Sequence, residues 1–205
     1  MSLNVKVIKI ILFDIGGVLV EFAGIKRMIE LMGNKATPDE LSRRWIYSEY
    51  VKLYESGKCD TETFADGVVK ELNMDITPED YIKEFPFFVK GFFPGAAELL
   101  QELKPKYRIA CLSNTNLIQW NGLCERVLID KYFHHNFLSF EIGKVKPDPE
   151  IYAYVIEKLE CAPDEIVFFD DNEVNVQAGL NAGMNSYRVL DFNDLRNKME
   201  ILKII

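Results

Sequence analysis

Four short apolar segments, each followed by polar or small residues, constrain the fold of this chain most strongly. They span residues 7–13, 108–112, 165–169 and 186–190, and a weaker candidate spans residues 136–140. Each consists mainly of aliphatic and aromatic residues, which is typical of strands buried on both faces of a parallel sheet. The segments therefore predict a parallel sheet at the centre of the molecule.

Stretches with helical periodicity separate these apolar segments. They cover residues 96–103, 117–129, 149–159 and 175–182. Alternation of strands with helices predicts that helices cover both faces of the sheet. The expected fold class is therefore α/β, with a doubly wound, Rossmann-like parallel sheet as its core.

A long stretch between the first two apolar segments interrupts this alternation. It is rich in helix-forming residues, and its central part holds the aromatic residues Trp45, Tyr47, Tyr50 and Tyr54. We interpret it as a small all-α cap that is inserted after the first strand, with these aromatic side chains inside its helical bundle. The predicted organisation is a catalytic core of residues 1–19 and 93–205 and a helical cap of residues 20–92.

Charge and composition limit the partners of the chain. The net charge of −8 at pH 7 weighs against nucleic acid, because proteins bind phosphate backbones mainly through Lys and Arg. The apolar run at residues 10–13 is far shorter than the roughly 20 residues of a membrane-spanning helix. The cysteines show neither a CxxC pair nor zinc spacing; they are Cys59, Cys111, Cys124 and Cys161. We therefore expect a cytoplasmic monomer with no membrane segment, whose partner is a small molecule.

Polar residues at the ends of the predicted strands are the candidates for chemistry. In an open parallel sheet, ligands bind beyond the carboxyl ends of the strands. The residues at this edge are Asp14, Ser113, Asn114, Lys146, Asp170 and Asp171. Taken singly, each has an ordinary explanation as a helix cap or a solvated charge. Together they bring three carboxylates to one edge, where a hard cation such as Mg²⁺ would offset their repulsion.

Four motifs, in this order, resemble those of the haloacid dehalogenase superfamily. They are FDIGGVL at residues 13–19, LSNTN at 112–116, KPDPEIY at 146–152 and FFDDN at 168–172. The likeness covers nearly the whole chain. Within the superfamily, the chain most resembles the helical-cap phosphatases of the α-D-glucose-1-phosphatase type, and the sequence YESG at residues 54–57 adds to this resemblance. The resemblance implies a Mg²⁺-dependent phosphatase that hydrolyses a small phosphate ester, with a hexose 1-phosphate favoured, through an aspartyl-phosphate.

The resemblance also implies a role for each residue of the reaction. Asp14 is the expected nucleophile, since carboxylates are known to form such covalent intermediates. Ser113 and Asn114 are expected to bind the phosphoryl oxygens, and Lys146 to neutralise the nucleophile and the transferred group. Glu55 of the cap is expected beside the substrate.

A second group of residues is expected to bind Mg²⁺. The ligands implied by the resemblance are the carboxylates of Asp14, Asp170 and Asp171 and the backbone carbonyl of Gly16. Asn175, one turn into the following helix, is expected to support them from outside the ligand sphere.

The chain departs from the family pattern at Gly16. Most phosphatases of the family have an aspartate two residues after the nucleophile, which acts as general acid and base. Such help is typically worth about 10²–10⁴-fold in rate. Three explanations stay open: a substrate with a good leaving group, a proton supplied by a cap residue such as Glu55, or a protein that binds phosphate compounds and turns them over poorly.

The third explanation leads to the main alternative function. In this alternative, the chain is a degenerate family member that binds phosphometabolites and acts as a sensor or regulatory protein. Two other activities are less favoured by the residues. A phosphomutase has to return the phosphoryl group, and the missing acid at Gly16 weighs against it. A 2-haloacid dehalogenase works without metal, so this activity would not explain the adjacent carboxylates of Asp170 and Asp171.

Overall fold

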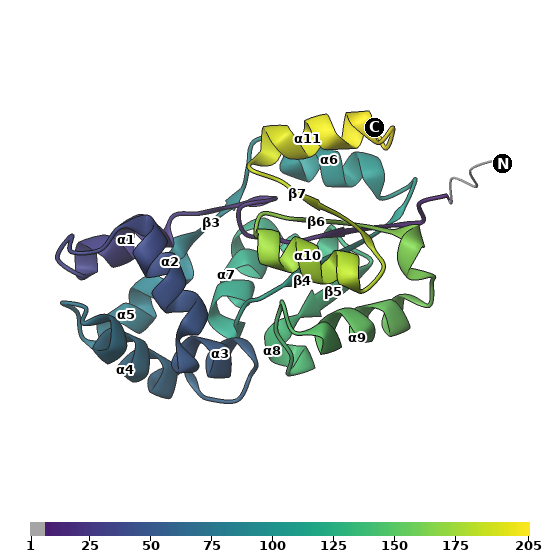
Figure 1. Ribbon diagram of the computed structural model, residues 1–205. Coiled ribbons are helices and arrows are strands. Elements are labelled where there is room, and N and C mark those ends of the chain that lie inside the picture. Colours follow the sequence, from purple (N-terminus) through teal and green to yellow (C-terminus); the bar gives the residue numbers. More distant parts are fainter. Residues whose placement is uncertain (1–6) are drawn as a thin grey trace.

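Residues 7–205 are described by the structure, a computed structural model with a parallel sheet at its centre (Figure 1). The strand order is β5–β4–β1–β6–β7, and every neighbouring pair is parallel. The strands are β1 (Ile10–Phe13), β4 (Arg108–Ser113), β5 (His135–Leu138), β6 (Ile166–Asp170) and β7 (Asn185–Arg188). The predicted α/β class is therefore confirmed, and each of the five apolar segments contributes one strand.

The first strand begins at Ile10 rather than at residue 7, and β4 and β6 each end one residue later than predicted. The two edge strands, β5 and β7, stop two residues earlier than predicted. The weak candidate at residues 136–140 begins at His135 and stops at Leu138, because Ser139 and Phe140 start the short helix α8 (Ser139–Ile142). The last strand ends at Arg188 rather than at residue 190. The early ends of β5 and β7 lie where the ladder of backbone hydrogen bonds stops, a boundary that varies by one or two residues.

Alternating side chains of the central strand β1 build the two halves of the core. Ile11 and Phe13 belong to one buried cluster, and Ile10 and Leu12 belong to another. This division follows from the two-residue period of a strand. All four side chains are 0% exposed, as expected for a strand covered on both faces.

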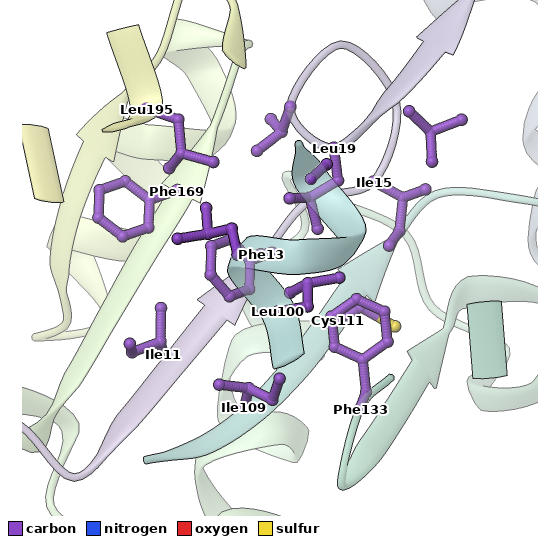
Figure 2. Close-up of a cluster of buried hydrophobic side chains, with 14 of the residues drawn as sticks. Ile11, Phe13, Ile15, Leu19, Leu100, Ile109, Cys111, Phe133, Phe169 and Leu195 are labelled. Carbon is purple, nitrogen blue, oxygen red and sulfur yellow. The ribbon is translucent and has the colours of Figure 1, made fainter. Parts of the chain in front are cut away.

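Helices from different parts of the chain cover the two faces. One face is covered by α6 (Ala96–Leu103), α7 (Leu117–Val127) and α11 (Phe192–Ile201). Figure 2 shows Leu100 of α6 and Leu195 of α11 beside Phe13 and Phe169 of the sheet. The other face is covered by α9 (Pro149–Leu159) and α10 (Glu173–Asn181). The sheet is thus doubly wound, as the alternation of strands and helices predicts.

Two of the four predicted core helices end where the sequence places them, and two do not. The predicted helix 117–129 stops at Val127, because Leu128 adopts a left-handed φ of 53° and a 3₁₀ turn (Ile129–Lys131) follows. The helix predicted at 175–182 begins earlier, because the side chain of Asn172 accepts a hydrogen bond from the backbone N–H of Val174 at 3.0 Å and caps it. A further 3₁₀ turn (Pro163–Glu165) precedes β6.

Five helices between residues 23 and 88 form a layer beside the sheet domain (Figure 1). They are α1 (Gly24–Leu31), α2 (Pro38–Tyr47), α3 (Glu49–Glu55), α4 (Thr61–Leu72) and α5 (Pro78–Glu84), followed by a 3₁₀ turn (Phe85–Phe88). We call this insertion the cap and propose residues 20–92 as its extent. Two short strands, β2 (Val20–Phe22) and β3 (Val89–Phe92), pair antiparallel where the chain enters and leaves it. The sequence analysis missed this ribbon, because it is too short to show a periodic pattern.

The interior of the cap is aromatic, but not all the predicted residues contribute to it. The ring of Phe64 stacks on Tyr54 at 4.3 Å and meets Trp45 edge-on at 6.2 Å between centroids. The prediction was wrong for Tyr47 and Tyr50, which are 84% and 38% exposed. Leu41 is the only fully buried side chain of α2 among those described, and Tyr47, the last residue of this helix, lies outside the bundle. Within residues 7–205, no helix combines the length and apolarity that crossing a bilayer requires.

The buried central strand yields a prediction of stability. Leu12→Ala should lower the free energy of unfolding by about 2–5 kcal/mol, because it leaves a cavity in a fully buried cluster. Leu190→Ala is the matched control, because Leu190 is 71% exposed and its truncation should cost less than about 0.5 kcal/mol. Urea unfolding followed by circular dichroism measures both, and equal losses would contradict the assignment of Leu12 to the core.

Candidate active site

The sheet topology brings the candidate residues to one edge. Asp14 directly follows β1, Ser113 is the last residue of β4, and Asp170 is the last residue of β6. Because β1 pairs with both β4 and β6, the carboxyl ends of the three strands lie side by side. The sequence placed these residues after separate strands, and the structure brings them together.

A buried ammonium group connects two of the carboxylates. Lys146 Nζ lies 2.8 Å from Asp14 Oδ1 and 2.6 Å from Asp170 Oδ2, and the Lys146 residue is only 4% exposed. The same nitrogen lies 5.7 Å from the centre of the Phe168 ring. Burial opposes the charged form of Lys146, but the two carboxylates outweigh it and raise its pKa above the usual value. Lys146 is therefore a fixed positive charge beside Asp14.

Three carboxylates gather around this lysine. One oxygen from each of Asp14, Asp170 and Asp171 can be chosen so that all lie within 4.8 Å of one another. Burial raises the pKa of Asp14 to about 7; the charge of Lys146 opposes this rise, and the charges of Asp170 and Asp171 add to it. Burial and the Asp170 carboxylate also raise the pKa of Asp171. One ammonium against three carboxylates leaves an excess of two negative charges, which a divalent cation with hard oxygen ligands would balance.

The loop after β1 is shaped to admit Asp171. Gly17 has a left-handed φ of 74°, and a β-carbon there would lie 2.7 Å from Asp171 Oδ2. Only glycine satisfies both requirements. Gly16 also lies in this loop, and its backbone carbonyl stays a predicted metal ligand.

Asp170 is oriented by an amide side chain. Asn175 Nδ2 donates to both Asp170 oxygens, at 3.0 and 3.2 Å, and the backbone N–H of Asn172 donates to Oδ1 at 2.9 Å. Asn175 is thus placed behind a candidate metal ligand, where the sequence analysis expected it. Such partners fix the orientation of a ligand and tune its affinity for a metal.

Asn114 has a contact that the sequence did not reveal. Its side-chain Nδ2 donates to the backbone carbonyl of Lys146 at 2.9 Å, and its Oδ1 accepts from the backbone N–H of Lys146 at 2.8 Å. The paired bonds hold the lysine segment against the end of β4. The Asn114 side chain is therefore occupied with Lys146, which leaves its backbone N–H as the group available to a phosphate. Sequence alone carries no signal for a pairing across 32 positions.

A cleft of about 800 Å³ opens between the cap and this edge of the sheet. From the core it is lined by Asp14, Ser113 and Lys146, and from the cap by Trp45, Tyr47 and Glu55, among others. Glu55, the last residue of α3, therefore faces the same space as the predicted nucleophile. The aromatic residues of the cap were predicted to be interior; instead, Tyr47 lines the cleft, and Trp45 both packs in the bundle and lines the cleft.

Comparison with known proteins places the sequence in a protein family. The family described as haloacid dehalogenase-like hydrolase matches residues 8–183. A D-ribitol-5-phosphate phosphatase of Bacteroides thetaiotaomicron is 26% identical over 95% of this chain and 98% of its own length. A phosphorylated carbohydrates phosphatase of Thermotoga maritima is 29% identical over 85% of this chain and 81% of its own length.

A solved structure shows the same architecture. A HAD family enzyme from Bacteroides thetaiotaomicron, crystallised with magnesium and inorganic phosphate, aligns with a TM-score of 0.74 and 27% identity. The alignment covers 89% of this chain and 94% of that protein. The chain therefore belongs to the haloacid dehalogenase-like hydrolases, and the resemblance seen in its four motifs is confirmed.

The Asn175 contact yields a prediction of metal affinity. In Asn175→Ala, the affinity of the carboxylate cluster for Mg²⁺ should fall about 10–100-fold, because Asp170 loses the donor that orients it. Calorimetric titration of the protein with MgCl₂ measures the change. Asn181→Ala, at the exposed end of the same helix, is the matched control and should leave the affinity unchanged. Equal affinities of the two variants would contradict the role of Asn175 in orienting Asp170 for the metal.

Proposed function

We propose that the protein is a Mg²⁺-dependent phosphatase of small phosphorylated carbohydrates, with Asp14 as its nucleophile. The observation that carries the proposal is the buried Asp14–Lys146–Asp170 contact, with Asp171 beside it, at the floor of an open cleft. A carboxylate paired with an ammonium and surrounded by an excess of negative charge is suited to attack phosphorus once a cation balances the site.

The relatives support the phosphatase class and the kind of substrate. Two of them are named as phosphatases of D-ribitol 5-phosphate and of phosphorylated carbohydrates. Sugar phosphates and polyol phosphates share one chemistry, a phosphate ester on a hydroxylated carbon chain. The substrate proposed for this chain is of that class, with hexose 1-phosphates and pentitol phosphates as its first candidates.

Each residue of the core has a separate role in the first chemical step. An Asp14 oxygen attacks phosphorus, the bond from phosphorus to the ester oxygen breaks, and an aspartyl-phosphate forms. Lys146 holds Asp14 in place and offsets charge on the transferred group, while Ser113 and backbone N–H groups after β4 hold the phosphoryl oxygens. Mg²⁺, held by Asp14, Asp171, Asp170 and the Gly16 carbonyl, would supply further neutralisation of phosphate charge.

The cap side of the cleft fits a hydroxylated leaving group. Trp45 and Tyr47 present aromatic faces, while Arg43, Lys52 and Glu55 present charged hydrogen-bonding groups. A volume of about 800 Å³ holds a phosphorylated sugar with room for water. Residues with charged, amide or hydroxyl side chains outnumber the aliphatic and aromatic ones around this space, which favours a carbohydrate over a lipid-like ester.

A second function has one observation in its favour. Gly16 supplies no side chain at the position where most relatives in the family carry an acid, which suits a protein that binds phosphometabolites without fast turnover. Beryllium fluoride, which mimics an aspartyl-phosphate, tests whether the site is competent. Binding that requires Mg²⁺ supports the enzyme, and failure to bind supports the degenerate member.

The proposed function predicts metal-dependent phosphate release. We expect the protein to hydrolyse p-nitrophenyl phosphate and at least one of glucose 1-phosphate and ribitol 5-phosphate with MgCl₂. Turnover should cease with EDTA and return on addition of MgCl₂, because three carboxylates without a cation repel the phosphate. Asp14→Asn should abolish turnover, because its amide is not a nucleophile. Release of inorganic phosphate measures all of these.

Two controls accompany the measurement of phosphate release. Glu102→Gln removes a carboxylate of an exposed ion pair with Lys106 and should keep full activity, because it lies in the last turn of α6, which leads to the start of β4 at the opposite edge of the sheet. Chloride release from 2-chloropropionate without metal would instead establish a dehalogenase. Activity that persists in Asp14→Asn would contradict the assignment of the nucleophile.

A further inference from the structure

The space beside Gly16 is open rather than filled by packing. A β-carbon at position 16 would meet no atom within 4 Å, and the φ of Gly16 is not among the positive values of the chain. A side chain is therefore permitted there both by space and by backbone conformation. The fold retains room for the acid that most family phosphatases carry at this position.

A small cavity of about 170 Å³ lies against Gly16, at the back of the cleft. Its walls include Gly16, Ser113, Thr115 and Gln119 from the core and Trp45 and Glu55 from the cap. Of the described residues that line it, Glu55 is the only one with an ionisable side chain. The cap thus presents one carboxyl group to the space that Gly16 leaves open.

The backbone around Glu55 is held in place from both ends of its helix. The Ser48 hydroxyl caps α3 by accepting from the backbone N–H of Val51 at 3.3 Å, and it donates to Glu71 at 2.5 Å. Just beyond Glu55, Gly57 lies so close to the core that a β-carbon would come within 2.3 Å of the Phe140 carbonyl oxygen. Glu55 therefore belongs to a part of the cap that is seated directly on the core.

The surroundings of Glu55 suit a group that both gives and takes a proton. Burial raises the pKa of Glu55 to about 7, while a hydrogen bond from Trp45 and the charge of Lys146 oppose the rise. An acid–base group works best when its pKa lies near the operating pH. The three carboxylates of the core have other roles in the proposed reaction. Asp14 is the nucleophile, Asp170 accepts bonds from Lys146, Asn172 and Asn175, and Asp171 is a predicted metal ligand.

We propose that Glu55 of the cap is the acid–base residue of the phosphatase, in place of the carboxylate that is missing at Gly16. This inference rests on the proposed function. In the first step, Asp14 attacks phosphorus, and protonated Glu55 gives its proton to the ester oxygen as the bond from that oxygen to phosphorus breaks. The alcohol leaves, and Glu55 is left as a carboxylate.

The second step returns both residues to their starting state. A water molecule attacks the phosphorus of the aspartyl-phosphate, and the Glu55 carboxylate takes a proton from that water. The bond between phosphorus and the Asp14 oxygen breaks, which releases inorganic phosphate and restores the Asp14 carboxylate. Glu55 ends protonated and is ready for the next ester.

Glu55→Gln tests the proposal, because the amide keeps the shape of the side chain and can neither give nor take the proton. With a carbohydrate phosphate that the wild type hydrolyses, kcat should fall about 10²–10⁴-fold. With p-nitrophenyl phosphate, whose leaving group needs no proton, rapid mixing should show a burst close to one p-nitrophenolate per active site, followed by slow turnover. The burst arises because the first step survives and the attack of water does not.

Gly16→Asp supplies the second variant. The double variant Gly16→Asp/Glu55→Gln should recover at least about tenfold of the turnover lost by Glu55→Gln, because the new carboxyl enters the open space beside position 16. A residue that only supports the fold would give neither the burst nor this rescue. Glu62→Gln, an exposed carboxylate on α4 of the same cap, is the matched control and should behave as the wild type.

The outcomes separate the two claims. If Glu55→Gln keeps wild-type turnover of the carbohydrate phosphate, or slows the p-nitrophenolate burst as much as it slows that turnover, the role of Glu55 is overturned while the phosphatase stands. If the wild type itself releases no phosphate from any of these esters with MgCl₂, the proposed function is overturned first.

Discussion

The buried contact of Lys146 with Asp14 and Asp170 is the interaction on which the rest of the site depends. A lysine that is 4% exposed is costly unless its charge is paired, and here two carboxylates at 2.8 and 2.6 Å pair it. Those carboxylates stand at the ends of adjacent strands, so the parallel register of β1 and β6 sets their separation. Asn114 holds the backbone of Lys146 from β4, and Asn175 holds Asp170 from α10. The ends of three strands, the loop that carries Lys146 and helix α10 thus meet around one ammonium group.

The same arrangement leaves the site short of positive charge. Lys146 neutralises only part of the charge of Asp14, Asp170 and Asp171. Burial raises the pKa of Asp14 to about 7, and the charges of Asp170 and Asp171 add to this rise. A divalent cation held by these carboxylates would offset their repulsion. The excess of negative charge that adds to the raised pKa of Asp14 is therefore the same feature that favours Mg²⁺.

Much of this could be predicted from the sequence, because the signals involved are local. Buried parallel strands appear as apolar runs such as residues 166–170, and the edge of the sheet follows from where those runs stop. The Asn114–Lys146 pairing could not be predicted, because it joins residues that only the tertiary fold brings together. Tyr47 was misplaced for a related reason: composition identifies an aromatic bundle, but only the packing of α2 decides which of its residues lie inside.

Placing the acid–base group on the cap has a consequence for how the enzyme works. The proposed nucleophile, Asp14, lies on the core, whereas Glu55 is the last residue of α3 in the cap, so the proposed proton transfer requires α3 to lie against the core. Two contacts hold α3 against the core, the packing of Gly57 on Phe140 and the ion pair of Lys52 with Asp148 at 3.6 Å. If the cap only contacted the substrate, it would change the affinity for the substrate. If the cap also supplies the acid–base group, it changes the rates of both chemical steps as well. If Glu55 has the proposed role, contacts with the substrate and transfer of the proton depend on the same helix, α3, because Lys52 and Glu55 of this helix both line the cleft.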